Sequence, residues 1–139
     1  LRQSPVWRGG GAAFGPKPRC YAQKLNKKVA QLAFRRALSD RIREGAVKIV
    51  DDLSLSEPRT KLAAAMLKNL GVDRCLLVTH AVDPALALAT RNLPRVEVLC
   101  ARDVGVYHLV RYPALVVSRA AWTVLEARLQ GSRGEESAR

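Results

Sequence analysis

The chain has few cysteines, no long apolar run and almost no acidic residues near its start. Its three cysteines, Cys20, Cys75 and Cys100, are odd in number, lie far apart and form no CxxC pair. This pattern disfavours a disulfide framework or a zinc site and favours reduced thiols inside a cell. No apolar run approaches the roughly 20 residues of a membrane helix. We therefore expect no membrane span, no metal and no cofactor.

Acidic residues are scarce in one region only. The 139 residues carry 24 Lys and Arg against 12 Asp and Glu, a net charge of +12. Residues 1–43 contain 11 basic side chains and a single acid, Asp40, whereas residues 44–139 contain 13 basic and 11 acidic side chains. Because a concentrated basic block indicates an interaction surface, nucleic acid is the leading partner and a membrane surface the weaker alternative.

Residues 1–25 are expected to form an extended, irregular arm. Glycines at 9, 10, 11 and 15 and prolines at 5, 16 and 18 disfavour a regular helix or central strand. Aromatic residues (Trp7, Phe14, Tyr21) alternate there with cations (Arg2, Arg8, Lys17, Arg19, Lys24). Cations neutralise phosphates and rings stack on unpaired bases, so the set favours RNA. Trp7 closing a local apolar patch, or Phe14 and Tyr21 fastening the arm to the body, are the alternatives.

A helix is predicted from an N-cap at Asn26 to about Glu44, where Gly45 ends it. One side of this helix is apolar, with Val29, Ala30, Ala33, Phe34, Ala37 and Leu38. The opposite side gathers Lys28, Arg35, Arg36, Ser39 and Arg43. We expect the first side to be buried and the second to contact RNA, although a merely solvated charged face is the alternative.

The rest of the body alternates short apolar strands with helices. Strands are expected at 46–51, 74–79, 96–99 and 115–117, and helices at 56–70, 83–92, 106–111 and 119–129, with Pro58 in the first turn of its helix. This rhythm predicts an α/β fold, a parallel sheet of about four strands with helices on both faces. The predicted organisation is the arm at 1–25, the α/β body at 26–130 and a polar tail at 131–139.

An α/β body also admits an enzyme. His80 follows a predicted strand, and Asp51, Asp52 and Asp83 lie near strand ends, where active sites of such folds occur. The chain has no GxGxxG after a strand, no Walker A lysine and no GxSxG elbow. Capping and turn roles for these acids are therefore favoured over catalysis.

Several motifs resemble the universal large-subunit ribosomal protein four family in its bacterial-type form. The most specific are residues 4–11 (SPVWRGGG) and 14–19 (FGPKPR). Shorter matches follow in order at 37–39, 50–52, 67–72, 91–94 and 106–107. The resemblance covers nearly all of residues 2–130.

The resemblance implies a structural, non-enzymatic rRNA-binding protein of the large ribosomal subunit, in a bacterium or an organelle. In the family, a long internal loop penetrates the rRNA and its tip helps line the peptide exit tunnel. The arm here resembles the returning limb of that loop. The family's first strand, first helix and loop tip have no counterpart in the chain, so we expect either a fragment or a second polypeptide that supplies them. Neighbouring ribosomal proteins are the other implied partners.

The residues assigned to RNA binding are Arg2, Trp7, Arg8, Gly9, Gly10, Gly11, Phe14, Lys17, Arg19, Tyr21, Lys24, Lys27, Lys28, Arg35, Arg36 and Arg43. Two rival functions stay open at this point. One is an RNA-binding regulator outside the ribosome, and the other is a small α/β enzyme that uses His80.

Overall fold

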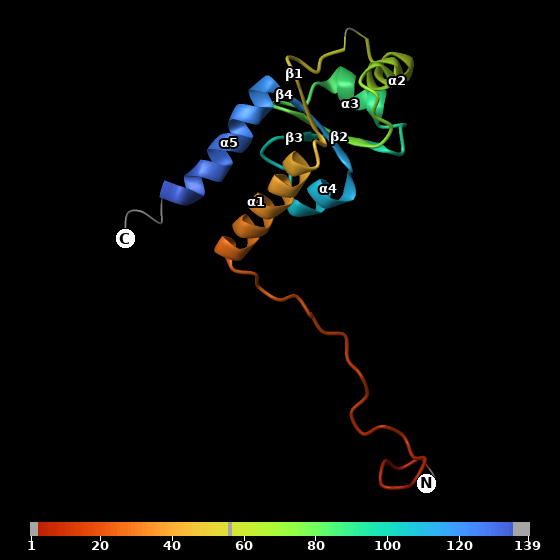
Figure 1. The fold of residues 1–139 in the computed structure, drawn as a ribbon. Helices are drawn as coiled ribbons and strands as arrows, with labels where there is room; N and C mark the ends of the chain where they lie inside the picture. The colour runs from red at the N-terminus through yellow and green to blue at the C-terminus, as the bar shows by residue number, and fades with distance from the viewer. Residues whose placement is uncertain (1–2, 56, 135–139) are drawn as a thin grey trace.

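The computed structural model describes residues 3–55 and 57–134 (Figure 1). Arg2, one of the predicted RNA-binding residues, lies outside the described residues, as do 135–139 of the predicted tail. In chain order the elements are α1 (Lys27–Arg43), β1 (Val47–Val50), α2 (Thr60–Asn69), β2 (Cys75–Thr79), α3 (Pro84–Thr90), β3 (Val96–Cys100), α4 (Val106–Arg111), β4 (Ala114–Ser118) and α5 (Arg119–Gly134).

The four strands form one parallel sheet in the order β1-β4-β2-β3. The first helix α1 packs against α4 and α5, whereas α2 packs against α3. Each group of helices covers its own face of the sheet, as Figure 1 shows. The predicted α/β class, with a parallel four-stranded sheet between two helical layers, is thus confirmed.

The two central strands are apolar up to their last residues, Thr79 and Ser118, because helices cover both of their sides. In β2, Leu76 and Val78 face the core beneath α1, α4 and α5, while Cys75 and Leu77 face the core beneath α2 and α3. Every residue of β2 is buried. An alternating polar pattern would place polar groups in one of these cores, which explains the continuous apolar run.

Helix ends agree with the sequence signals in most places. Gly45 and Gly71 have φ of +67° and +64°, the left-handed conformation that ends a helix most easily at glycine. Asp83 accepts a hydrogen bond from the Ala85 amide at 3.2 Å and caps α3. Asn26 occupies the N-cap position of α1, but its side chain makes no capping hydrogen bond.

Two helix boundaries were predicted wrongly. Helix α2 begins at Thr60, not around Pro58, because the Arg59 amide bonds the Glu57 carbonyl at 2.8 Å in a tight turn and Arg59 itself is extended. Ser56 lies outside the described residues. Helix α5 continues to Gly134, five residues beyond the predicted end, so residues 131–134 belong to a helix and not to a tail. In the part of the chain that is described, no helix is suited to cross a membrane.

Because the sheet is parallel, all strands begin at one end of it and finish at the other. We call the first the amino end of the sheet, next to Val47, Cys75, Val96 and Ala114, and the second the carboxyl end. The connecting helices run back in the opposite direction. Their C-termini therefore lie at the amino end, together with the last turn of α1.

Candidate nucleic-acid interface

Residues 3–25 run away from the body as an extended arm (Figure 1). The aromatic side chains of the arm are open to solvent, with exposed fractions of 68% for Trp7, 92% for Phe14 and 74% for Tyr21. The arm's backbone hydrogen bonds join its own residues. The alternative in which Phe14 and Tyr21 fasten the arm to the body therefore finds no support, and three large rings stay available to a partner.

The first part of the arm folds into a compact turn. The Trp7 amide bonds the Ser4 carbonyl at 3.1 Å, the Gly10 amide bonds Trp7 at 2.9 Å, and the Gly11 amide bonds Gln3 at 3.1 Å. Gly9 has φ of +78°, and a Cβ on Gly10 would lie 1.9 Å from the Ser4 carbonyl oxygen. Two of the glycines that were predicted to bind RNA are thus required by the turn itself. The turn presents Trp7 and Arg8 at its outer surface.

The cations of the arm are exposed and spaced along it. Arg8, Lys17, Arg19 and Lys24 are all solvent-facing, and the Arg19 guanidinium lies 4.5 Å from the centre of the Tyr21 ring. Lys27 and Lys28 continue the series in the first turn of α1, which contains no acidic residue. A positive charge at a helix N-terminus opposes the helix dipole. These two lysines therefore do not stabilise α1, and an anionic partner would relieve the repulsion.

The predicted basic side of α1 is only partly as expected. Arg36 and Arg43 are exposed, but both lie near Asp40, at 3.1 and 4.0 Å, so an acid is interspersed among them. Arg35 does not face outward: its guanidinium donates to the Leu129 carbonyl at 2.9 Å and joins α1 to α5. The prediction for the orientation of Arg35 was wrong because the sequence does not show where the C-terminal helix packs.

The predicted apolar side of α1 is also less buried than expected. Phe34 and Leu38 are buried in the core, whereas Val29, Ala30 and Ala33 are exposed. The first two turns of α1 extend beyond the sheet, as Figure 1 shows. Periodicity predicted the orientation of the buried side correctly but not the length over which neighbours cover it.

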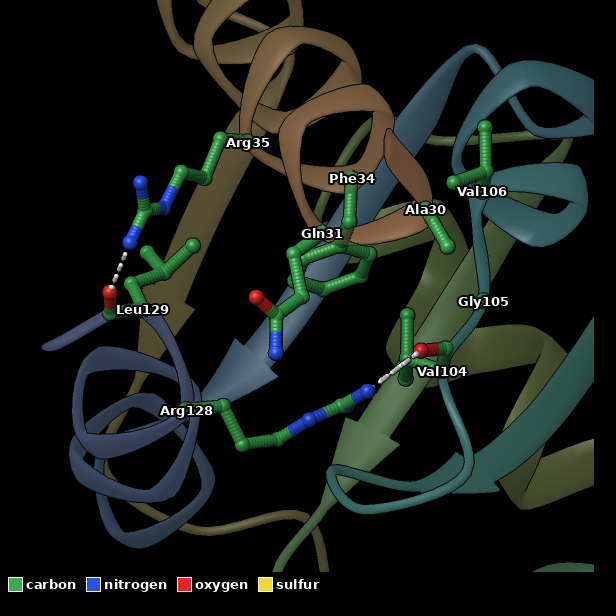
Figure 2. A pocket seen from close by; sticks show the side chains of 9 residues that line it. All are labelled: Ala30, Gln31, Phe34, Arg35, Val104, Gly105, Val106, Arg128 and Leu129. Carbon is green, nitrogen blue, oxygen red and sulfur yellow. Dashed lines mark hydrogen bonds between the residues drawn. The ribbon is translucent and has the colours of Figure 1, made fainter. Parts of the chain in front are cut away.

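A cavity of about 460 Å³ lies between α1, α5 and the segment before α4 (Figure 2). Arg128, which the sequence reasoning did not single out, reaches across it and donates to the Val104 carbonyl at 3.2 Å and to the Ala101 carbonyl. Its guanidinium also lies 4.9 Å from the centre of the Phe34 ring. Because its donors are used on backbone carbonyls, Arg128 joins helix to loop and is not a free anion-binding group.

The acids that the enzyme hypothesis requires have structural partners. Asp51 pairs with Arg119 at 2.8 Å, Asp52 accepts from the Leu53 amide and the Ser54 hydroxyl at 2.7 and 2.8 Å, and Asp83 caps α3. His108 accepts from the Gly105 amide at 3.1 Å at the start of α4. Among the described residues, no group of three His, Cys, Asp or Glu side chains could hold a metal ion.

Two side chains of the body have perturbed acidities. Burial raises the pKa of the Cys75 thiol to about 11. Burial also raises the pKa of Tyr112, and a hydrogen bond to Glu97 adds to this effect. Both groups stay protonated at neutral pH, so neither supplies a nucleophile there.

The fold and the surface together define a class: a parallel α/β domain preceded by an exposed arm of aromatic rings and cations. The chain belongs to the Ribosomal protein L4/L1 family, whose family model matches residues 1–128. The family that the motifs suggested from the sequence is therefore confirmed.

Several curated relatives, each named "Large ribosomal subunit protein uL4", are similar to this chain over most of its length. The protein of Nitratidesulfovibrio vulgaris is 41% identical over 92% of this chain and 62% of its own length. Those of Moorella thermoacetica and Bordetella bronchiseptica are 42% and 43% identical, over 86% and 93% of this chain and 58% and 63% of their own lengths. The chain thus spans about three fifths of these relatives. They are longer single chains, which gives no support to a second polypeptide that completes this one.

Proposed function

We propose that the chain is a structural component of a large ribosomal subunit and binds rRNA through its arm, without catalytic activity. The observation that carries the proposal is the arm: three exposed rings and a series of exposed cations on a backbone whose hydrogen bonds, among the described residues, join the arm only to itself. An extended cationic segment of this kind gains its shape and its binding free energy together when it lies between RNA helices.

The family supports the same function. Relatives that match 86–93% of this chain are named as proteins of the large ribosomal subunit. Under this proposal the partners are large-subunit rRNA and neighbouring ribosomal proteins, and the location is the ribosome of a bacterium or an organelle. The arm follows a path into the rRNA toward the exit tunnel.

The residues proposed to contact rRNA are those of the arm and of the exposed side of α1. They are Trp7, Arg8, Gly9, Gly10, Gly11, Phe14, Lys17, Arg19, Tyr21, Lys24, Lys27, Lys28, Arg36 and Arg43. Arg35 is removed from the set because it bonds the Leu129 carbonyl.

A paired substitution in the arm tests the proposal. Trp7→Ala with Arg8→Ala removes one ring and one cation from the turn, and we expect weaker incorporation into large subunits while the body keeps its unfolding temperature. Co-sedimentation with large subunits measures the first and circular dichroism the second. The matched control, Leu88→Ala with Arg59→Ala, removes one exposed apolar side chain and one exposed cation from the body.

Equal incorporation of the arm variant and the control would overturn the proposal. A large pool of the native protein away from ribosomes, bound to another RNA, would favour the regulator instead. An activity lost on His80→Ala would favour the enzyme. Under the proposed function, rRNA binding also weakens steeply as salt rises, because each phosphate contact releases counterions.

A further inference from the structure

Charge is unevenly distributed between the two ends of the sheet, although residues 44–139 carry nearly balanced charge in total. Seven exposed basic side chains lie at the amino end: Arg43, Lys48, Lys68, Arg74, Arg91, Arg95 and Arg111. The acids there are Asp40 (4.0 Å from Arg43), Glu44 (paired with Arg41 at 2.8 Å), Asp73, and Glu97, the second residue of β3, which hydrogen-bonds Tyr112. The carboxyl end instead holds five acids (Asp51, Asp52, Glu57, Asp83 and Asp103) with four cations (Arg59, Lys61, Arg102 and Arg119). The amino end is thus a second basic surface, distinct from the arm.

Three of these arginines stand at the starts of three neighbouring strands. Arg74 directly precedes β2, and Arg95 directly precedes β3, the next strand on one side. The Cys75 amide donates to the Arg95 carbonyl at 3.1 Å, so the two backbones are in contact at this point. Arg111 ends α4, three residues before β4, whose Ala114 is in register with Cys75. Sheet order therefore brings together three cations that are distant in sequence.

Two tyrosines accompany these arginines. The Arg111 guanidinium lies 5.6 Å from the centre of the Tyr107 ring and 5.4 Å from that of Tyr112, and it donates to the Tyr107 hydroxyl at 2.9 Å. Arg74 lies 5.9 Å from the Tyr112 ring. Tyr112 is buried and fixes the position of the pair, whereas Tyr107 is 63% exposed. A guanidinium held against a ring keeps its charge and its remaining donors while losing little freedom on binding.

A simpler explanation is that the arginines neutralise the negative ends of the helix dipoles, which also lie at the amino end. Arg41 fits that explanation, since it donates to the Leu109 and Val110 carbonyls in the last turn of α4. Arg111, the last residue of α4, also lies at such a helix end, but its hydrogen bond goes to the exposed Tyr107 and not to a carbonyl of the helix. Arg74 and Arg95 follow turns and sit outside the helices. Within the described residues, these three arginines also have no carboxylate within ion-pair distance.

We propose that the amino end of the sheet is a second RNA-binding surface, in which Arg74, Arg95 and Arg111 contact phosphates and Tyr107 stacks on an unpaired base. The inference rests on the proposed function and adds to it a contact made by the folded body. RNA fits this surface because it offers closely spaced phosphates together with flat bases, matching two cations held against tyrosine rings, a third at the start of the neighbouring strand, and the exposed ring of Tyr107.

The test compares two triple variants of the full chain in binding to deproteinised bacterial large-subunit rRNA over a range of salt concentrations. One variant carries Arg74→Gln, Arg95→Gln and Arg111→Gln at the amino end. The control carries Arg59→Gln, Arg102→Gln and Arg119→Gln at the carboxyl end, so both lose three exposed guanidinium groups. We expect the amino-end variant alone to bind more weakly, with a log–log salt slope shallower by about three.

Two further variants separate the contribution of positive charge from that of stacking on Tyr107. Arg74→Lys with Arg95→Lys and Arg111→Lys keeps the charge, so the salt slope is expected to return, and Tyr107→Ala is expected to weaken binding without changing the slope. The arm variant Trp7→Ala with Arg8→Ala should weaken binding additively with the amino-end triple. Circular dichroism melting verifies that each variant is folded.

The results distinguish a failure of this inference alone from a failure of the proposed function. If binding depends on the arm but the amino-end and carboxyl-end variants bind equally, the amino end does not contact RNA and the inference is overturned alone. If the unaltered chain does not bind the rRNA, the proposed function fails together with the inference.

Discussion

Arginine side chains perform two different tasks in this protein. Arg35, Arg41 and Arg128 donate to backbone carbonyls of distant elements and hold α1, α4 and α5 together. Arg8, Arg74 and Arg111 instead direct their guanidinium groups to solvent or against a tyrosine ring. The first group contributes to the stability of the fold, and the second group is the one that we propose to bind an anionic partner.

The buried Cys75 thiol makes stability depend on pH in the alkaline range. In the unfolded chain it loses its proton near its ordinary pKa of 9.0, whereas in the folded protein the pKa is about 11. Stability is therefore fully present below pH 9 and falls as pH rises toward 11, because proton loss then favours the unfolded state. We expect a loss of about 1–2 kcal/mol by pH 10.5 from this group.

Urea unfolding at pH 8 and pH 10.5 measures this effect. Cys75→Ala serves as the comparison: it is less stable at both pH values, because it leaves a small cavity, but should lose less on going to pH 10.5. Tyr112 contributes equally to both proteins and cancels in the difference. Parallel losses in the two proteins would refute the assignment to Cys75.

At the scale of elements, helix α3 shows how one short helix is divided between core and solvent. Leu86 is completely buried beneath the sheet, whereas Leu88, two residues later, is 50% exposed. Asp83 and Pro84 start the helix, so its orientation is fixed from its first turn. Ala89 and Thr90 are buried with Leu86, so one side of α3 faces the sheet and Leu88 lies on the other, as helical geometry predicts.

The pair of leucines gives a matched prediction for stability. Leu86→Ala should lower the free energy of unfolding by about 2–5 kcal/mol, because it removes a buried side chain and leaves a cavity. Leu88→Ala, the same chemical change in the same helix, should cost less than about 0.5 kcal/mol. Chemical denaturation of both variants checks the difference. Similar losses for both would mean that α3 packs differently.

At the scale of the whole molecule, the chain divides into an exposed arm and a packed body. The arm's backbone hydrogen bonds stay within the arm, while the body has a core on each face of the sheet. The arm therefore depends on a partner for its shape, and the body does not.

Limited digestion with trypsin tests this division. Cleavage should occur first after Arg19 and Lys24, which are exposed in extended backbone, and after Arg8, which is exposed in the turn of the arm, and only later between β1 and α5. Large-subunit rRNA should protect the arm sites. Mass spectrometry of the early fragments identifies the cuts. Early cleavage within the body, at a rate equal to that in the arm, would contradict the division.

Local chemistry made much of the fold predictable. Apolar runs such as 75–78 are typical of a parallel sheet covered on both faces, and Gly45 and Gly71 mark helix ends because they take positive φ without strain. The start of α2 was predicted too early, because Pro58, which is common in the first turn of a helix, belongs here to a turn between Glu57 and Arg59. The end of α5 was missed because its polar last turns carry no periodic apolar pattern.

The sequence by itself determined the α/β class, the irregular arm with its rings and cations, and the family, because each depends on residues that are close together in the chain. Tertiary structure decided which cations are free. Arg35 and Arg36 are adjacent and chemically identical, yet one bonds a carbonyl of α5 and the other stays exposed. Likewise Arg74, Arg95 and Arg111 become one surface only when the sheet places β2 between β3 and β4. Strand order depends on long-range packing, which no local pattern encodes.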